Sequence, residues 1–173
     1  MKITLKLAAD AKKLADEQPP KEKRPFLEEK LPVRSGGKAP ATLGTGRRIL
    51  VVDDNPVVLK AFELKLRANG FTVATILDAA EIASAAETSD AELVILDINF
   101  PTSQGLDWTG YTCMKWLRRF PELAEIPVIL ISGEDAKQHK EKSLAAGAVA
   151  FFQKPVPYPE LLAAILRALH IEA

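Results

Sequence analysis

The sequence predicts an α/β fold in which a doubly wound sheet of five parallel strands is covered by five helices. Short, continuous apolar runs such as Ile49–Val52 and Leu93–Leu96 indicate strands that are buried on both faces, as is typical of parallel sheets. Segments with apolar residues at helical spacing alternate with these runs along the chain. Because crossovers between parallel strands are right-handed, such helices come to lie on both faces of the sheet.

The first helix has the clearest local signals. It follows the strand at 49–52, and Asn55 and Pro56 are suited to its cap and to its first turn. Asn69-Gly70 is suited to its end. Its apolar positions at helical spacing are Val58, Leu59, Phe62 and Leu66.

The remaining elements follow the same alternation. After a strand at 71–75, Asp78 and Glu81 have the spacing of a capping box, and they open a helix that runs to about Glu87. Pro159 is suited to the first position of the last helix. The other expected strands are 93–96, 127–131 and 149–152, and the other expected helices are 111–119, 136–146 and 159–170.

Residues 1–46 differ in composition from the rest of the chain, and we interpret them as an N-terminal extension or linker that precedes a domain at 47–173. They contain ten Lys/Arg and six Asp/Glu, a net charge of +4, whereas residues 47–173 carry a net charge of −4. Pro, Gly and charged residues are dense after position 18, which is typical of linkers. Phe26, Leu27 and Leu31 are apolar exceptions that could dock on another surface.

The overall composition excludes several classes of protein. The formal net charge of the 173 residues is zero, so nothing in it favours nucleic-acid binding. The single cysteine, Cys113, excludes an intrachain disulfide and suits a reducing cytoplasm, where we expect the protein to act. No apolar run reaches 18 residues, so we expect no membrane-spanning helix, and the N-terminus lacks the apolar core of a signal peptide.

Polar side chains follow four of the expected strands at their carboxyl ends. Asp53 and Asp54 follow the first strand, Asp97 the third, Ser132 the fourth and Lys154 the fifth. In doubly wound sheets this edge forms the functional crevice, so these side chains should converge there. Three carboxylates need a hard cation, and Mg²⁺ prefers oxygen ligands of this kind. A lysine and a hydroxyl beside a metal suit the oxygens of a tetrahedral anion, and a carboxylate can be a nucleophile toward phosphorus.

Four segments in this order resemble the receiver domain of two-component response regulators. They are ILVVDDNP, LVILDINFP, VILISG and AGAVAFFQKP, and the resemblance covers residues 47–173. It implies a flavodoxin-like (CheY-like) arrangement of the predicted sheet. It also implies that Asp97 accepts a phosphoryl group from a phosphohistidine, and that Ser132 and Lys154 bind the phosphoryl oxygens.

The same resemblance implies a magnesium site and a switch. Asp54 binds Mg²⁺ directly, Asp53 binds it through water, and Asp97 and the backbone carbonyl of Asn99 complete the protein ligands. Phe151 matches the aromatic switch position, which acts together with Ser132. The Lys154-Pro155 bond is often cis in the family, and proline permits this isomer.

The loop after Asp97 departs from the family pattern. Phe100 stands where most receivers have methionine, and Gly105 has the expected glycine spacing. The following helix nevertheless fits better from Gly110, which indicates about five extra residues in the segment 101–110. Trp108 in this insertion is a candidate partner contact, and a partly buried loop anchor is an equal alternative.

We therefore expect a stand-alone response regulator receiver rather than an enzyme, apart from Mg²⁺-dependent phosphoryl acceptance and self-dephosphorylation. A histidine kinase or histidine phosphotransfer protein would supply the phosphoryl group, and a downstream protein would read the switched surface. A homodimer is left open. The last helix is small-sided and suited to contact at Ala163, Ala164 and Ala168.

Two other functions compete with this interpretation. The first is an interaction module that uses the same fold without phosphorylation, since a fold alone does not grant a function. The second is a phosphatase of the haloacid dehalogenase type, which places an Asp-x-Asp pair on its first strand. This chain has adjacent aspartates there and an isolated one on the third strand, so the receiver interpretation fits better.

Overall fold

The computed structural model describes residues 43–100, 109–133 and 136–172. Its strands are β1 (Arg48–Val52), β2 (Thr72–Ile76), β3 (Leu93–Asp97), β4 (Val128–Ser132) and β5 (Ala150–Gln153). Its helices are α2 (Pro56–Ala68), α3 (Ile82–Thr88), α4 (Gly110–Leu117), α5 (Ala136–Ala146) and α6 (Tyr158–Ala168), and a 3₁₀ turn η1 (Ala79–Glu81) precedes α3. Trp108 and the rest of the insertion at 101–108 lie outside the described residues, as do Phe26, Leu27 and Leu31.

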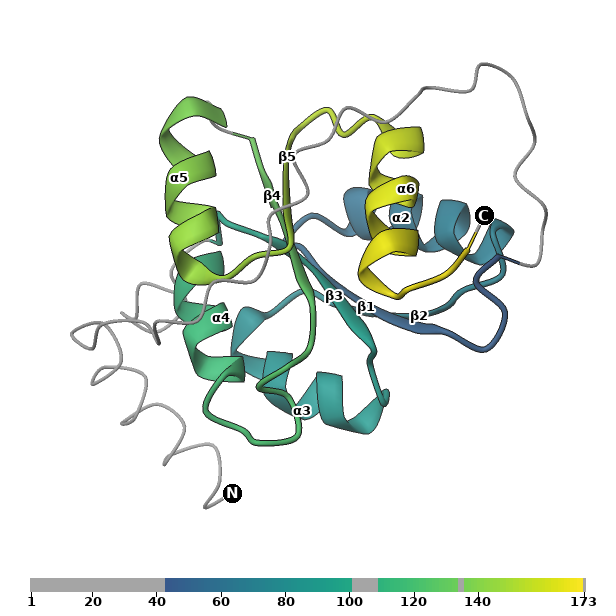
Figure 1. The fold of residues 1–173 in the computed structure, drawn as a ribbon, viewed down its shortest axis with the longest axis horizontal. Coiled ribbons are helices and arrows are strands. Elements are labelled where there is room, and N and C mark those ends of the chain that lie inside the picture. The colour runs from purple at the N-terminus through teal and green to yellow at the C-terminus, as the bar shows by residue number, and fades with distance from the viewer. Residues whose placement is uncertain (1–42, 101–108, 134–135, 173) are drawn as a thin grey trace.

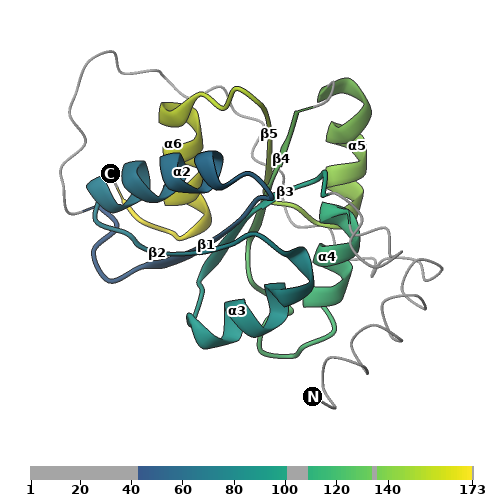
Figure 2. The same ribbon diagram turned by 180° about the vertical axis from the view of Figure 1, so that it is seen from behind.

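The five strands form one parallel sheet in the order β2-β1-β3-β4-β5. Helices α2 and α6 cover one face of it, and α3, α4 and α5 cover the other (Figure 1). The same two layers are visible from behind in Figure 2. This arrangement confirms the predicted doubly wound α/β fold. None of the helices in the described ranges is long and apolar enough to cross a membrane.

The central strands divide their side chains between two cores because successive residues of a strand point to opposite faces. On β1, Ile49 and Val51 join the core under α2 and α6, whereas Leu50 and Val52 join the core under α3 and α4. Every residue of β3 and β4 is buried. The continuous apolar runs of the sequence therefore reflect burial on both faces, as predicted.

The ends of the helices show where local sequence signals were sufficient to predict the boundary of a helix. Asn55 Oδ1 accepts a hydrogen bond from Val57 N at 2.9 Å, so Asn55 caps α2 as predicted. Gly70 ends α2 with a φ of 91°. Asp78 Oδ1 instead accepts from Ala80 N, so it caps the turn η1, and the α-helix that the capping box predicted begins only at Ile82.

Helix α6 ends two residues earlier than predicted. His170 has a left-handed backbone with a φ of 54°, and the N–H groups of His170 and Ile171 donate to Arg167 O and Leu166 O. This is the Schellman pattern, in which glycine is the usual left-handed residue. Because a histidine stands there instead, the sequence carried no ordinary stop signal.

The folded domain begins before Arg47. Leu43 packs on the core under α2 and α6, and Gly44 N donates to Asn69 O at 2.9 Å. A Cβ atom on Gly44 would lie 2.4 Å from the ring of Phe71, so the close packing requires glycine at this position. Leu43 and Gly44, assigned to the extension from sequence, are thus part of the packed domain.

Candidate functional site

The predicted polar residues lie together at the carboxyl edge of the sheet. Val52 pairs with Leu96 and Asp97 with Ile131, so Asp53, Asp97 and Ser132 lie at or just after the neighbouring ends of β1, β3 and β4. Asp53, Asp97 and Ser132 are buried and Asp54 is exposed. The parallel register thus brings together residues that are far apart in the sequence.

Lys154 joins the two buried carboxylates. Its Nζ lies 2.7 Å from Asp53 Oδ2 and 2.5 Å from Asp97 Oδ2. The Lys154 side chain is 27% exposed, so the ion pairs are largely shielded from solvent. One ammonium therefore faces two buried carboxylates, and the site keeps an excess of negative charge.

The other oxygen of each buried carboxylate is held by the backbone. Asp53 Oδ1 accepts from Asn55 N at 2.9 Å, and Asp97 Oδ1 accepts from Asn99 N at 3.2 Å. Each carboxylate is thus fixed at one oxygen by the loop that follows it and at the other by Lys154. This also places the backbone of Asn99, the predicted carbonyl ligand, beside Asp97.

Burial and charge act in opposite directions on the titration of the site. Burial raises the pKa of Asp97 above its ordinary value, and the hydrogen bond and charge of Lys154 only partly offset this rise. Burial lowers the pKa of Lys154, but its hydrogen bonds to Asp53 and Asp97 outweigh burial and leave that pKa raised. Lys154 therefore stays protonated at neutral pH, and added positive charge would favour the ionised form of Asp97.

The three carboxylates are placed to share a cation. Asp53, Asp54 and Asp97 each offer one oxygen, and these oxygens lie within 4.8 Å of one another. Such a set of oxygen ligands fits a hard divalent cation, and the exposed Asp54 leaves room for bound water. The excess negative charge of the site also favours the binding of a divalent cation electrostatically.

The backbone around Asp97 explains why the helix after the loop begins at Gly110. Gly110 N donates to Ile98 O at 2.8 Å, and Asn99 forms an antiparallel bridge with Thr109. A Cβ atom on Gly110 would lie 2.6 Å from Asp97 O and 2.9 Å from Ile98 Cα. Only glycine allows this approach, in agreement with the alignment from Gly110 rather than from Gly105, which lies outside the described residues.

Ser132 and Phe151 lie on the side of the site formed by β4 and β5. Lys154 N donates to Ser132 O at 2.7 Å, which fixes the end of β5 against the end of β4. Phe151 pairs with Leu130 and is half-buried against the core under α3 and α4. The Lys154-Pro155 bond is cis, the isomer that the family resemblance suggested.

One sequence interpretation needs correction away from the strand ends, and one contact was not predicted. Ala164 is only 5% exposed and belongs to the core under α6, so its prediction as a partner contact is wrong, while Ala163 and Ala168 are half-buried. The contact that was not predicted joins His139 to Tyr111: His139 Nδ1 lies 3.0 Å from Tyr111 Oη, and the two rings stack. This pair joins α4 to α5 across 28 positions of sequence, a distance over which no local pattern could have indicated it.

Comparison with known proteins matches the same region of the chain. The family model of the response regulator receiver domain matches residues 49–166. The transcriptional regulatory protein PrrA of Mycobacterium tuberculosis is 34% identical over 121 residues, which cover 70% of this chain and 49% of PrrA. The chain thus spans about half the length of that relative.

Two further proteins are matched over nearly their whole length. The polar-differentiation response regulator DivK of Brucella abortus is 28% identical over 119 residues, covering 69% of this chain and 93% of DivK. The crystal structure of a response regulator from Desulfuromonas acetoxidans superposes with a TM-score of 0.63 at 31% identity, covering 72% of this chain and 97% of that one.

Proposed function

The chain belongs to the response regulator receiver family, and on that premise we propose that it is a signalling switch that accepts a phosphoryl group on Asp97. The observation that carries the proposal is the shared contact of Lys154 with Asp53 and Asp97, with Asp54 close enough to share a cation with both. A half-buried ammonium that pairs with two buried carboxylates is not expected of a cluster of solvated surface residues.

In this proposal Asp97 is the nucleophile. A carboxylate oxygen forms a bond to phosphorus as the bond from phosphorus to the donor's imidazole nitrogen breaks, and the imidazole leaves with the electron pair. Asn99 N fixes Oδ1 of Asp97, and Lys154 contacts Oδ2. Such transfer depends mainly on positioning and on neutralising charge. The backbone and Lys154 position Asp97, and Lys154 neutralises part of the charge.

Asp53, Asp54 and Asp97, with the backbone carbonyl of Asn99, are the residues that would hold Mg²⁺. When bound, the cation would offset the carboxylate charge and the charge of the incoming phosphoryl oxygens. Lys154 and Ser132 would bind phosphoryl oxygens. Because Lys154 N is hydrogen bonded to Ser132 O, a shift of either residue can be passed to β5 and to Phe151.

We further propose that the protein acts in the cytoplasm as a receiver without turnover of a separate substrate. A histidine kinase or a histidine phosphotransfer protein would supply the phosphoryl group, and a downstream protein would read the altered surface formed by α5, β5 and α6. Trp108, in the insertion outside the described residues, is the proposed contact to the phosphodonor protein.

The proposal is tested by phosphorylation of the whole chain with a small phosphodonor such as acetyl phosphate. The wild type should gain one acid-labile phosphoryl group by intact-mass spectrometry when Mg²⁺ is present, and Asp97→Asn should gain none. Equal labelling of the two proteins would exclude Asp97 as the acceptor. A wild type that is never labelled would favour the interaction module that works without phosphorylation.

A further inference from the structure

The solvent-facing side of α2 carries an apolar stripe. Val57 is 74% and Leu64 is 59% exposed, and the exposed Ala61 and Ala68 continue the line. Their spacings of four, three and four residues place them on one face of the helix. This face, which we call the α2 stripe, is opposite to the core positions Leu59, Phe62 and Leu66.

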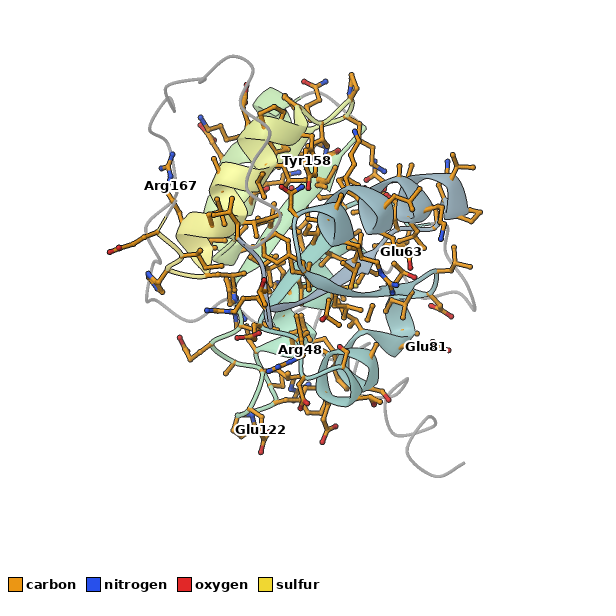
Figure 3. All side chains as sticks on the ribbon, turned by 90° about the vertical axis from the view of Figure 1, so that its right-hand side faces the viewer. Arg48, Glu63, Glu81, Glu122, Tyr158 and Arg167 are labelled. Atoms are coloured by element: carbon orange, nitrogen blue, oxygen red, sulfur yellow. The ribbon has the colours of Figure 1, made fainter. Side chains whose placement is uncertain are left out.

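Basic side chains border the α2 stripe on both sides. At 100° per residue, Lys60 and Arg67 lie along one edge and Lys65 along the other. Glu63 pairs with Lys60 at 2.9 Å and with Arg67 at 3.1 Å, and it is the single acidic residue of α2. Figure 3 shows Glu63 on α2 beside the sheet. The stripe therefore suits an apolar segment that carries negative charge.

The 42 residues that precede Leu43 join the domain at one end of this stripe. Leu43 packs on the core under α2, and Gly44 N donates to Asn69 O, directly after Ala68. Helix α2 has 13 residues and a length of about 20 Å. The eleven residues between Leu31 and Leu43 can span about 40 Å when extended, so the segment before them can reach the whole stripe.

We propose that residues 26–31 of the N-terminal extension bind the α2 stripe of the same chain. This segment, FLEEKL, combines apolar Phe26, Leu27 and Leu31 with the adjacent acids Glu28 and Glu29. Its apolar side chains match the stripe, and its acids match the basic borders. The contact uses apolar and basic residues of α2 and none of the carboxylates, and because Val57 lies three residues after Asp54, the bound segment lies near the carboxylate site.

The test compares methyl NMR spectra of the whole chain with and without the apolar residues of the segment. Leu27→Ser with Leu31→Ser should shift the methyl resonances of Val57 and Leu64. The methyl resonances of Leu123, which is buried in the core under α3 and α4 on the other face of the sheet, should stay in place and so serve as the internal control. Unchanged Val57 and Leu64 resonances would overturn the proposal.

Charge reversal provides the matched second variant. Glu28→Lys with Glu29→Lys should shift the same two residues, whereas Asp16→Lys with Glu17→Lys, another adjacent acidic pair in the extension, should not. Equal effects of the two pairs would contradict the assignment to residues 26–31. The wild-type spectrum should also be unchanged by dilution, and a dependence on concentration would assign the stripe to a second copy of the chain instead.

Discussion

Lys154 and Asp97, 57 positions apart in the sequence, meet at 2.5 Å between Nζ and Oδ2 at the carboxyl edge of the sheet. The same ammonium contacts Asp53, so a single positive charge holds two buried carboxylates. Breaking such an arrangement leaves an uncompensated buried charge, which costs more than the intact pairs contribute. The stability of the metal-free protein should therefore depend strongly on Lys154.

We predict that Lys154→Met lowers the free energy of unfolding of the metal-free protein by about 2 kcal/mol, below the range for fully buried pairs, because Lys154 is 27% exposed. Urea unfolding measures the change. Lys60→Met is the matched control, since Lys60 is 64% exposed in its pair with Glu63 and should cost less than about 1 kcal/mol. Equal losses in the two variants would contradict the role of Lys154 as the shared partner.

The pKa of Asp97 gives a second prediction. Burial outweighs Lys154 and raises this pKa, so the protonated form favours the folded state. Ionised Asp97 therefore lowers the free energy of unfolding by its full amount when the pH is above the pKa of Asp97 in the folded protein. This loss disappears as the pH falls through that pKa toward the pKa of the unfolded chain. In a ¹³C NMR titration without metal, the Asp97 carboxyl should titrate above the usual value of about 3.9, and higher still in Lys154→Met. A midpoint below the usual value would contradict the dominance of burial.

Mg²⁺ should raise the melting temperature of the wild type, because a ligand that binds only the folded state stabilises it. Asp54→Ala should abolish this response. Since Asp54 is exposed, removing its charge should stabilise the metal-free protein by no more than about 1 kcal/mol. Thermal unfolding with and without Mg²⁺ measures both effects, and an unchanged response in Asp54→Ala would remove this residue from the cation site.

The site was largely predictable because one topological rule places the ends of parallel strands at one edge. Asp53, Asp97, Ser132 and Lys154 each follow a recognisable apolar strand, so their convergence needed no knowledge of side-chain geometry. The two ion pairs of Lys154 with Asp53 and Asp97 could not be predicted in the same way. Their geometry depends on the register between strands and on the backbone that orients Lys154.

The features that the sequence predicted wrongly or did not indicate depend on a different kind of physical information. Ala164 was assigned to the surface from its size, but the rotation of α6 about its axis is set by the larger residues that pack beside it. His170 ends α6 in a backbone conformation that ordinarily calls for glycine. The Tyr111–His139 contact depends on how α4 and α5 pack, which no local sequence signal specifies.

The boundary of the domain leads to a prediction about truncation. A chain that begins at Leu43 keeps the contacts of Leu43 and Gly44 with the domain. It lacks residues 26–31, as any shorter chain also does, so it is the reference for measuring what residues 43–46 contribute. A chain that begins at Arg47 loses the half-buried Leu43 and the Gly44–Asn69 hydrogen bond, which should cost about 1–2 kcal/mol. Urea unfolding of the two truncated proteins measures the difference, and equal stability would show that residues 43–46 do not contribute.

The close approach of Gly110 to the backbone of Asp97 gives the last prediction. In Gly110→Ala the added Cβ would meet Asp97 O at 2.6 Å and Ile98 Cα at 2.9 Å, so the end of β3 or the start of α4 must move. We expect a loss of about 1–3 kcal/mol in the free energy of unfolding, as for other overpacked sites. Because the displaced backbone carries the proposed phosphoacceptor, labelling of Asp97 by a small phosphodonor should also slow.

Gly133→Ala is the matched control, because Gly133 follows Ser132 at the same edge and a Cβ there meets nothing within 4 Å. Its stability should stay within about 0.5 kcal/mol of the wild type, and its rate of labelling should be unchanged. Urea unfolding and intact-mass spectrometry measure the two quantities on the same samples. If Gly110→Ala loses stability but labels at the wild-type rate, the strain is absorbed by α4, and Gly110 does not position Asp97.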